Sequence, residues 1–286
     1  MYRTTLLLGA LQGDVGLLRS KIRALSRSLV SPCRVIVHGE SPPLQRFYLF
    51  DDDELAATAE SYKASVVRWA QSLVAPLTSD RLAFTLEYVW TKNLSAERHR
   101  WESDGELLIV YCAGKRIPSP FRHVVEESQC PVLLLSDRPW HTPPLLLAGI
   151  DPFHKSDRPA NMDIKIVNQA LALSRALKGE ITLVHSCYVP AYMVKYRSMI
   201  QSTHQQGVQE FITANGWRKL DWRLIQGEPT QALVHYCQSH RTDILVVGLV
   251  ARGVWQRQIT GSTSDGLLEI LCCDLLMVPK EAQPSG

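Results

Sequence analysis

The two halves of the chain repeat one order of sequence landmarks, about 140 residues apart. A short apolar run opens each half, and a second apolar run follows that ends in a histidine and a small residue. Each half then has an aspartate before a third apolar run and a cysteine before the last one. A repeat of this length is the usual size of one domain. The matching segments are Leu6–Leu8 with Leu145–Leu147, Val35–Gly39 with Thr182–Ser186, Asp104–Val110 with Asp243–Val247, and Cys130–Leu134 with Cys273–Met277.

Within each half, short apolar runs alternate with longer segments of helical periodicity. This alternation is typical of a parallel sheet with helices on both faces. We therefore predict an α/β protein of two tandem Rossmann-like domains, each with a five-stranded parallel sheet. The strands are expected at Thr4–Gly9, Arg34–Val37, Leu82–Val89, Leu107–Tyr111 and Val132–Leu135, and then at Leu145–Ile150, Ile181–His185, Asp221–Ile225, Ile244–Val247 and Leu275–Val278.

The segments between these strands predict the helices. Apolar residues recur at helical spacing after Ile164 and mark a buried face, and Gly179 is expected to cap that helix. The expected helices are Val15–Leu29, Asp53–Val74, Ala96–Glu102, Phe121–Ser128, Ile164–Lys178, Lys195–Ala214, Thr230–Ser239 and Ser264–Leu271.

A polar, proline-rich stretch, Ser136–Pro144, separates the two halves. Such a composition predicts a short and rather stiff linker. We therefore expect one domain over residues 1–138 and a second over residues 143–286.

The composition excludes several classes of protein. A hydrophobic content of 45% and a charged content of 21% are those of a globular chain. A net charge of +3 over 286 residues gives no case for a nucleic-acid-binding surface. No apolar run approaches the roughly 20 residues of a membrane span, and the N-terminal apolar stretch is far shorter than the core of a signal peptide. We therefore expect a cytoplasmic protein with no nucleic-acid or membrane partner.

The seven cysteines show neither a CxxC motif nor a paired metal-ligand spacing. Most lie beside predicted strands, where a reduced cysteine packs as a small core residue. We therefore expect no metal site. The cysteines are Cys33, Cys112, Cys130, Cys187, Cys237, Cys272 and Cys273.

One strand of the second half leads into a loop suited to binding an anion. Ile244–Val247 is a continuous apolar run of the kind that is buried on both faces of a sheet, and Gly248 ends it. The loop that follows contains Gly253 and Gly261, and Ser262–Asp265 offer N-caps for the next helix. A strand, a glycine-containing loop and a capped helix together present backbone N–H groups to a phosphate. The alternative is a surface loop that is kept only for the fold.

The spacing of this loop resembles the ATP-binding loop of the universal stress protein family, Gly-x2-Gly-x9-Gly-(Ser/Thr). Gly248, Gly261 and Ser262 stand in register with that motif, whereas Ala251 occupies the position of the middle glycine. Further landmarks follow in the family's order over Pro144–Lys280, about half of the chain. They are Leu146–Asp151 for the first strand with its terminal aspartate, Leu183–His185 for the end of the second strand, and Gly227–Pro229 for the turn before the third helix. The chain is thus similar to a tandem, two-domain member of the family, of the E type.

The resemblance implies a nucleotide site, for ATP and Mg²⁺, in the C-terminal domain only. Asp151 would accept a hydrogen bond from the adenine or its ribose, or it serves only as a cap before Pro152. Ser186 would meet the adenine through its backbone. Arg252 and Arg257 could pair with the phosphates and offset the effect of alanine in the loop. The nucleotide-binding residues implied are Asp151, Ser186, Gly248, Ala251, Gly261, Ser262 and Thr263.

The N-terminal half lacks the features of this site. Tyr111 stands where Gly248 stands in the repeat, and the segment after it is about six residues shorter. That segment contains two prolines, which have no N–H to give to a phosphate. Ala10 or Leu11 takes the place of Asp151. We therefore predict that the first domain is a degenerate copy without a nucleotide site.

No catalytic residue is predicted. The sequence contains no P-loop, zinc-protease or serine-hydrolase motif, and His38 and His185 match each other in the repeat, which favours a structural role for both. We expect a stress-response protein that acts by binding. One alternative is a scaffold that binds a protein or a small apolar ligand instead of a nucleotide, and another is a weak ATPase.

The last strand of each half is entirely apolar and is expected to need a covering partner. In single-domain members of the family that the chain resembles, two chains dimerise through this strand. The linker after Leu135 is long enough to let Val132–Leu135 and Leu275–Val278 face each other within one chain. We predict such an intramolecular pseudo-dimer, and the formation of a homodimer by two chains stays open.

Overall fold

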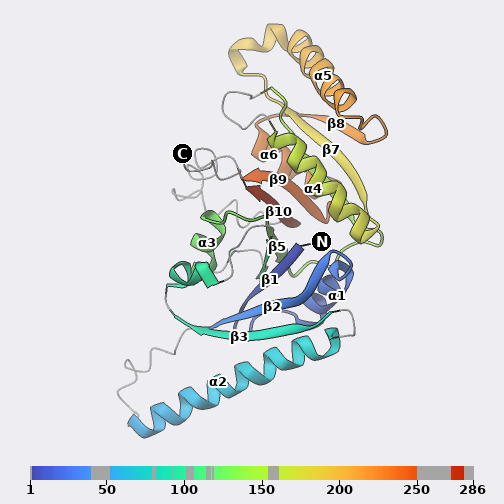
Figure 1. Ribbon diagram of the computed structural model, residues 1–286. Coiled ribbons are helices and arrows are strands. Elements are labelled where there is room, and N and C mark those ends of the chain that lie inside the picture. The colour runs from blue at the N-terminus through green and yellow to red at the C-terminus, as the bar shows by residue number, and fades with distance from the viewer. Residues whose placement is uncertain are drawn as a thin grey trace, which may run out of the picture. The chain divides into compact units, whose positions relative to one another are not determined.

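The computed structural model describes residues 2–39, 52–78, 82–91, 93–100, 106–113, 117, 119–153, 161–249 and 272–279 (Figure 1). The chain divides into two compact units, Met1–Asp137 and Arg138–Gly286. The boundary lies inside the proline-rich stretch that the sequence predicts as a linker. In both units the described strands form a parallel sheet, as predicted.

In the first unit the strands lie in the order β3-β2-β1-β4-β5, and all the pairs are parallel. The inner strands β1 and β4 are almost wholly buried, because helices cover a sheet of this kind on both faces. The strands are β1 (Tyr2–Gly9), β2 (Leu29–Gly39), β3 (Phe84–Trp90), β4 (Glu106–Cys112) and β5 (Val132–Ser136).

In the second unit the order is β10-β9-β6-β7-β8, again with parallel pairs. If the strands of each unit are numbered from its start, both sheets have the order 3-2-1-4-5, the second one read from β8 to β10. The residues of the outermost strand β8 are all half-buried or exposed, as expected for a strand with a neighbour on one side. The strands are β6 (Leu145–Gly149), β7 (Glu180–Cys187), β8 (Asp221–Gln226), β9 (Ile244–Leu249) and β10 (Asp274–Pro279).

The described helices connect these strands (Figure 1). Two begin with a side-chain cap: Asp14 accepts the N–H of Leu17 before α1, and Glu228 accepts the N–H of Gln231 before α6. The α-helices are α1 (Val15–Leu25), α2 (Asp52–Val74), α3 (Ser119–Glu126), α4 (Met162–Leu177), α5 (Arg197–Ala214) and α6 (Pro229–Ser239), and the 3₁₀ segments are η2 (Ala75–Leu77), η3 (Leu94–Arg100) and η4 (Ala191–Tyr196).

The strand order determines where a ligand can approach the sheet. In the second unit the chain moves outward from β6 to β7 and β8, and then returns to β9 on the other side of β6. Because crossovers between parallel strands are right-handed, this reversal places helices on both faces. It also separates the connections that leave β6 and β9 at their carboxyl ends. Ligands of open α/β sheets bind in the crevice at such a reversal.

The first helix is shorter than the sequence predicts. α1 ends at Leu25 and not at Leu29, because the backbone and hydroxyl groups of Ser28 both donate hydrogen bonds to the Leu25 carbonyl and close a turn. Leu29 then begins β2, where it pairs with Tyr2 of β1.

The end of α4 also differs from the prediction. Lys178, and not Gly179, takes the left-handed conformation, with a φ of 54°. The N–H of Gly179 donates to the carbonyl of Ser174 at 2.9 Å, which is the bond of a Schellman motif. Gly179 serves a different purpose, since a Cβ there would lie 2.6 Å from the carbonyl oxygen of Pro144.

Three other predicted helices need comment. The segment expected as α-helix from 96 is the 3₁₀ segment η3 up to Arg100, and residues 101–102 lie outside the described ones. The start of the helix expected over 195–214 belongs to the 3₁₀ segment η4. The helix predicted over Ser264–Leu271 lies outside the described residues. No helix of the described part of the chain is long and apolar enough to span a membrane.

Candidate functional site

The crevice of the second unit lies at the carboxyl ends of β6 and β9. Ala148 of β6 pairs with Val246 of β9, so Ile150 and Gly248 follow at the same level. Asp151 comes directly after, where β6 has ended. The predicted carboxylate and the first glycine of the predicted loop therefore lie on the two sides of the reversal in strand order, as a nucleotide site on this fold requires.

A hydrogen bond holds the backbone of Asp151, and its carboxylate lies beside His185. Its N–H donates to the carboxylate Oδ1 of Asp163, in the first turn of α4, at 2.9 Å. Its own Oδ1 lies 3.9 Å from Nδ1 of His185, and 19% of its side chain is exposed. The carboxylate thus lies at the edge of the sheet, within reach of a ligand in the crevice.

His185 of β7 is a buried structural residue. Its Nδ1 lies 3.0 Å from the carbonyl oxygen of Ile150, and its Nε2 lies 2.7 Å from Nδ1 of His204. Because a carbonyl can only accept, Nδ1 of His185 carries the proton and Nε2 accepts from His204. In the first unit, Nε2 of His38 donates to the carbonyl of Thr91 at 2.7 Å. Both matched histidines thus bind backbone carbonyls, in agreement with the structural role expected for them.

An aromatic stack joins α5 to the carboxyl edge of the sheet, and the sequence analysis missed it. The rings of Phe153 and His204 stack with centroids 4.5 Å apart, and His204 stacks in turn on His185 at 5.0 Å. A Cβ on Gly207 would collide with the Phe153 ring. The glycine in the middle of α5 therefore gives the ring room to pack against the helix. A glycine inside a predicted helix was the one feature of the sequence that could have indicated this contact.

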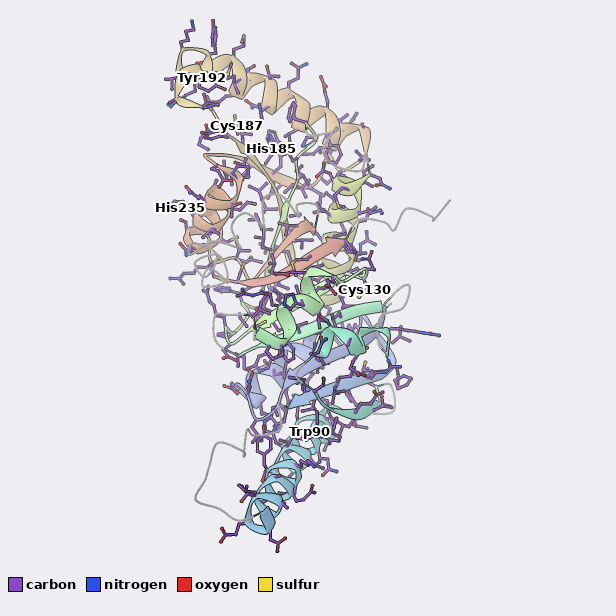
Figure 2. The ribbon with its side chains drawn as sticks, turned by 90° about the vertical axis from the view of Figure 1, so that its left-hand side faces the viewer. Trp90, Cys130, His185, Cys187, Tyr192 and His235 are labelled. Carbon is purple, nitrogen blue, oxygen red and sulfur yellow. The ribbon has the colours of Figure 1, made fainter. Side chains whose placement is uncertain are left out.

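Ser186 and Gly227 close the end of β7 against β8. The hydroxyl of Ser186 donates to the carbonyl of Gly227 at 2.7 Å, and Gly227 has a φ of 121°, which strongly favours glycine. Beside it lies an open hollow of about 340 Å³ at the N-terminus of α6, lined by residues that include Gly227, Glu228 and His235. Figure 2 labels His235 on α6 and His185 on β7. The side chain of Ser186 is thus used within the fold, and the role predicted for its backbone stays a prediction.

The structure places three of the predicted nucleotide residues, Asp151, Ser186 and Gly248, at the carboxyl edge of one sheet. The other four, Ala251, Gly261, Ser262 and Thr263, lie outside the described residues, as do Arg252 and Arg257.

In the first unit, a tyrosine side chain occupies the corresponding crevice. Tyr111 is buried near the carboxyl end of β4, and its ring packs so closely on Gly13 that a Cβ there would collide with it. Its hydroxyl accepts the N–H of Asp14 at 2.8 Å and donates to the carboxylate of Asp137. Burial, followed by the hydrogen bond and charge of Asp137, raises the pKa of Tyr111. The ring therefore fills the space where the chain turns from β1 into α1.

Strand register supports the equivalence of Tyr111 and Gly248. Tyr111 pairs with Leu135 of β5, and Gly248 pairs with Val278 of β10. Leu135 and Val278 each stand five residues after the repeated cysteine of their unit. One position of the fold thus carries a large aromatic side chain in the first unit and no side chain in the second.

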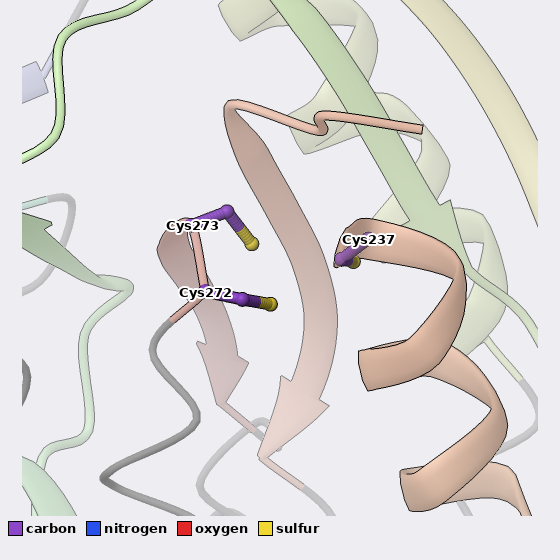
Figure 3. Close-up of side chains that lie close together, drawn as sticks. All are labelled: Cys237, Cys272 and Cys273. Atoms are coloured by element: carbon purple, nitrogen blue, oxygen red, sulfur yellow. The ribbon is translucent and has the colours of Figure 1, made fainter. Parts of the chain in front are cut away.

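Three cysteines that the sequence did not connect lie together in the second unit (Figure 3). Cys237 belongs to the last turns of α6, and Cys272 and Cys273 directly precede β10. Their sulfur atoms all lie within 4.8 Å of one another. Cys237 stands 35 residues before Cys272, so no local spacing could have indicated the cluster.

The three thiols perturb one another's ionisation. Hydrogen bonds with Cys237 and Cys273 lower the pKa of Cys272 to about 3, while the hydrogen bond with Cys272 raises the pKa of Cys237 to about 12. Hydrogen bonds with both neighbours raise the pKa of Cys273. The positive charge of Arg138 also favours ionisation of Cys272. Of the three thiols, Cys272 is therefore the one whose ionisation the cluster favours.

Most of the second unit matches a known protein family. The model of the universal stress protein family matches residues 157–279, which include α4 and every later strand of this unit. Residues 157–279 are a universal stress protein domain. This match confirms the family that the loop spacing and the landmarks of the second half indicate.

Solved structures extend the likeness to the whole chain. A candidate universal stress protein from Pseudomonas aeruginosa UCBPP-PA14 is 14% identical, with a TM-score of 0.65, and the match covers 98% of this chain and 94% of that one. A universal stress protein from Archaeoglobus fulgidus DSM 4304 is 13% identical, with a TM-score of 0.62, covering 99% and 100%. The first unit thus has the fold of universal stress proteins as well. No curated protein matches the chain.

A shorter universal stress protein, solved in complex with cAMP, is 18% identical over 47% of this chain and 96% of its own, with a TM-score of 0.32.

Proposed function

We propose that the chain is a stress-response protein that binds a nucleotide, with ATP as the expected ligand, at the crevice between β6 and β9 of its universal stress protein domain. Asp151 would accept a hydrogen bond from the adenosine moiety. Backbone N–H groups of the segment after Gly248 would meet the phosphates, and Mg²⁺ would accompany them. The family, the place of the crevice and the position of Asp151 support this proposal.

The observation that carries the proposal is the contrast between Gly248 and Tyr111. In the first unit, the Tyr111 ring packs on Gly13 and its hydroxyl bonds to Asp14 and Asp137, so a side chain lies where a ligand would approach. In the second unit, glycine stands at the same position, so backbone groups can approach a phosphate closely. We infer one nucleotide site for each chain, in the second unit.

We further propose that the protein acts by binding and not by turnover. No described group at the crevice is arranged as a nucleophile with an adjacent base, since His185 is committed to Ile150 and His204. None of the seven cysteines forms a disulfide, and six are buried, which suits the reducing cytoplasm in which we expect the protein to work.

Calorimetry of the full-length protein with ATP and Mg²⁺ tests the proposal. We expect a stoichiometry near one per chain, with affinity reduced about 10–100-fold in Asp151→Ala, because a charge-assisted hydrogen bond is lost. Asp221→Ala is the matched control, since Asp221 begins β8 at the opposite edge of the same sheet. It should bind ATP like the wild type.

Two results of this titration would contradict the proposal. A stoichiometry near two would mean that the first unit also binds nucleotide, despite Tyr111. No binding at all would favour the scaffold alternative. Phosphate release from ATP that depends on Asp151 would instead show that the protein is a weak ATPase.

One observation favours a second function, the binding of an apolar ligand or a protein. Aromatic and apolar side chains are exposed around η4, where Figure 2 labels Tyr192. Tyr192 and Met199 are 83% and 63% exposed. Clusters of this kind on protein surfaces mark interaction sites. Mass spectrometry of the molecules released from the heat-denatured protein distinguishes the two functions, since a nucleotide or an apolar compound would be found.

A further inference from the structure

The sulfur cluster lies at the edge of the second sheet opposite to the proposed nucleotide site. Cys273 precedes the first residue of β10, and Asp274 of β10 pairs with Ile244, the first residue of β9. The nucleotide crevice is at the carboxyl ends of these parallel strands, and the thiols are at the amino ends. The cluster is therefore a separate feature of this unit.

Hydrogen bonds hold the backbone at Cys237 and directly after Cys273. The carbonyl of Cys237 accepts the N–H of Thr242 at 3.0 Å, where the chain turns toward β9. The N–H of Asp274 donates to the carbonyl of Asp243 at 2.9 Å, and the Asp274 carboxylate accepts the indole N–H of Trp140 at 2.7 Å. These bonds position Cys237 and Cys273 in the way that a preorganised ligand set requires.

The sulfur separations suit a bound metal ion. An ion with three thiolates at about 2.3 Å would hold the sulfur atoms about 4 Å apart. The sulfur atoms lie at most 4.8 Å from one another. Small rotations of the side chains would bring them to the spacing that the ion requires. In Figure 3 the three side chains extend toward a common space between α6 and the start of β10.

The donor set and its burial indicate the kind of ion. Within the described residues, the group contains three cysteines and no histidine or carboxylate. Cys237 and Cys273 are 1% and 4% exposed, whereas Cys272 is half-buried, so one of the three thiols is in contact with solvent. Thiolate sulfur selects soft ions such as Cu(I) over hard ones. Zn²⁺ favours four ligands in a closed tetrahedral site, and a set of three sulfurs suits Cu(I) better.

We propose that Cys237, Cys272 and Cys273 form a three-thiolate site for a soft monovalent metal ion, with Cu(I) as its expected occupant. On binding, each thiol that coordinates the ion releases its proton to solvent, and no oxidation is involved. The bound ion would join the end of α6 to the start of β10.

Anaerobic titration of the reduced, untagged full-length protein with Cu(I), in competition with a chromophoric Cu(I) chelator, tests this site. We expect one tightly bound Cu(I) per chain, and an X-ray absorption spectrum with only sulfur ligands at about 2.3 Å. Cys237→Ser and Cys272→Ser should each weaken binding by about 100-fold or more, because loss of a direct ligand exceeds the effect of outer contacts. Zn²⁺ at the same concentration should not displace Cu(I).

Cys130→Ser is the matched control. Cys130 precedes β5 as Cys273 precedes β10, but it belongs to the first unit, and its sulfur lies 3.3 Å from a serine hydroxyl. This variant should bind Cu(I) like the wild type. Circular dichroism distinguishes loss of the site from loss of the fold, and Cu(I) should raise the Tm of the wild type but not of Cys272→Ser.

Three results would overturn the proposal. They are the absence of a stoichiometric Cu(I) site in the reduced wild type, unchanged affinity in a natively folded Cys237→Ser variant, and displacement of Cu(I) by equimolar Zn²⁺.

Discussion

At the scale of single residues, one side chain distinguishes the two units. The Tyr111 ring packs on Gly13 between the ends of β1 and β4, and its hydroxyl satisfies both a backbone N–H and a carboxylate. The second unit has Gly248 at this position, which carries no side chain. The two units thus share one order of strands and differ in the size of the side chain at this position.

Tyr111→Phe should lower the free energy of unfolding by about 1–3 kcal/mol, because Asp14 and Asp137 lose a buried hydrogen-bond partner. Urea denaturation measures the change. Tyr88→Phe in the same unit is the control, since the buried Tyr88 hydroxyl has no hydrogen-bond partner within the described residues. Tyr88→Phe should leave the free energy of unfolding unchanged or raise it slightly. Equal losses in both variants would contradict the assigned role of Tyr111.

Ala251 lies outside the described residues, and its effect stays a prediction. If this position needs a positive φ, alanine costs about 1–2 kcal/mol there. Ala251→Gly should then tighten ATP binding about 5–30-fold in calorimetry. Unchanged affinity would remove alanine as an obstacle to the ligand.

At the scale of elements, the end of α4 shows two neighbouring residues with different constraints. Lys178 is strained because it is left-handed, whereas Gly179 is needed because Pro144 comes so close. The sequence places a glycine at the helix end, and the usual interpretation assigns it the left-handed position. The contact with Pro144, 35 residues earlier, decides otherwise.

Lys178→Gly should therefore stabilise the protein, by up to about 1 kcal/mol, because relief of the left-handed strain exceeds the gain in unfolded-state entropy. Gly179→Ala should destabilise it, because the new Cβ would press on the Pro144 carbonyl. Thermal unfolding measures both changes. The opposite signs would show that the cap is Gly179 after all.

At the scale of the whole molecule, two units of one fold have come to differ in their sites. We place a nucleotide and a Cu(I) ion at opposite edges of the second sheet, and neither in the first unit. The first unit retains the strand order and the buried histidine, because both belong to the fold and not to the ligand site.

The pairing of the last strands within one chain stays a prediction from their apolar pattern. Leu134→Lys combined with Leu276→Lys should loosen or unfold the monomer, because a lysine cannot replace a buried leucine without loss. Size-exclusion chromatography and urea denaturation measure this. A double variant that stays compact and only changes from dimer to monomer would contradict internal pairing.

The sequence by itself determined the order of the elements, the family and the location of Asp151. These follow from local signals: apolar runs such as Ile244–Val247 become buried strands, and whatever follows a parallel strand lies at its carboxyl edge. Gly248 and Asp151 could therefore be assigned to one crevice in advance.

Only the tertiary structure decided which side chains meet across the sheet. Tyr111 reaches Asp14 and Asp137, and Cys237 meets Cys272 and Cys273. These residues are far apart in the chain and have no periodic relation, so their contacts depend on how helices pack on strands. Packing is set by many weak interactions at once, and no local pattern in the sequence encodes it.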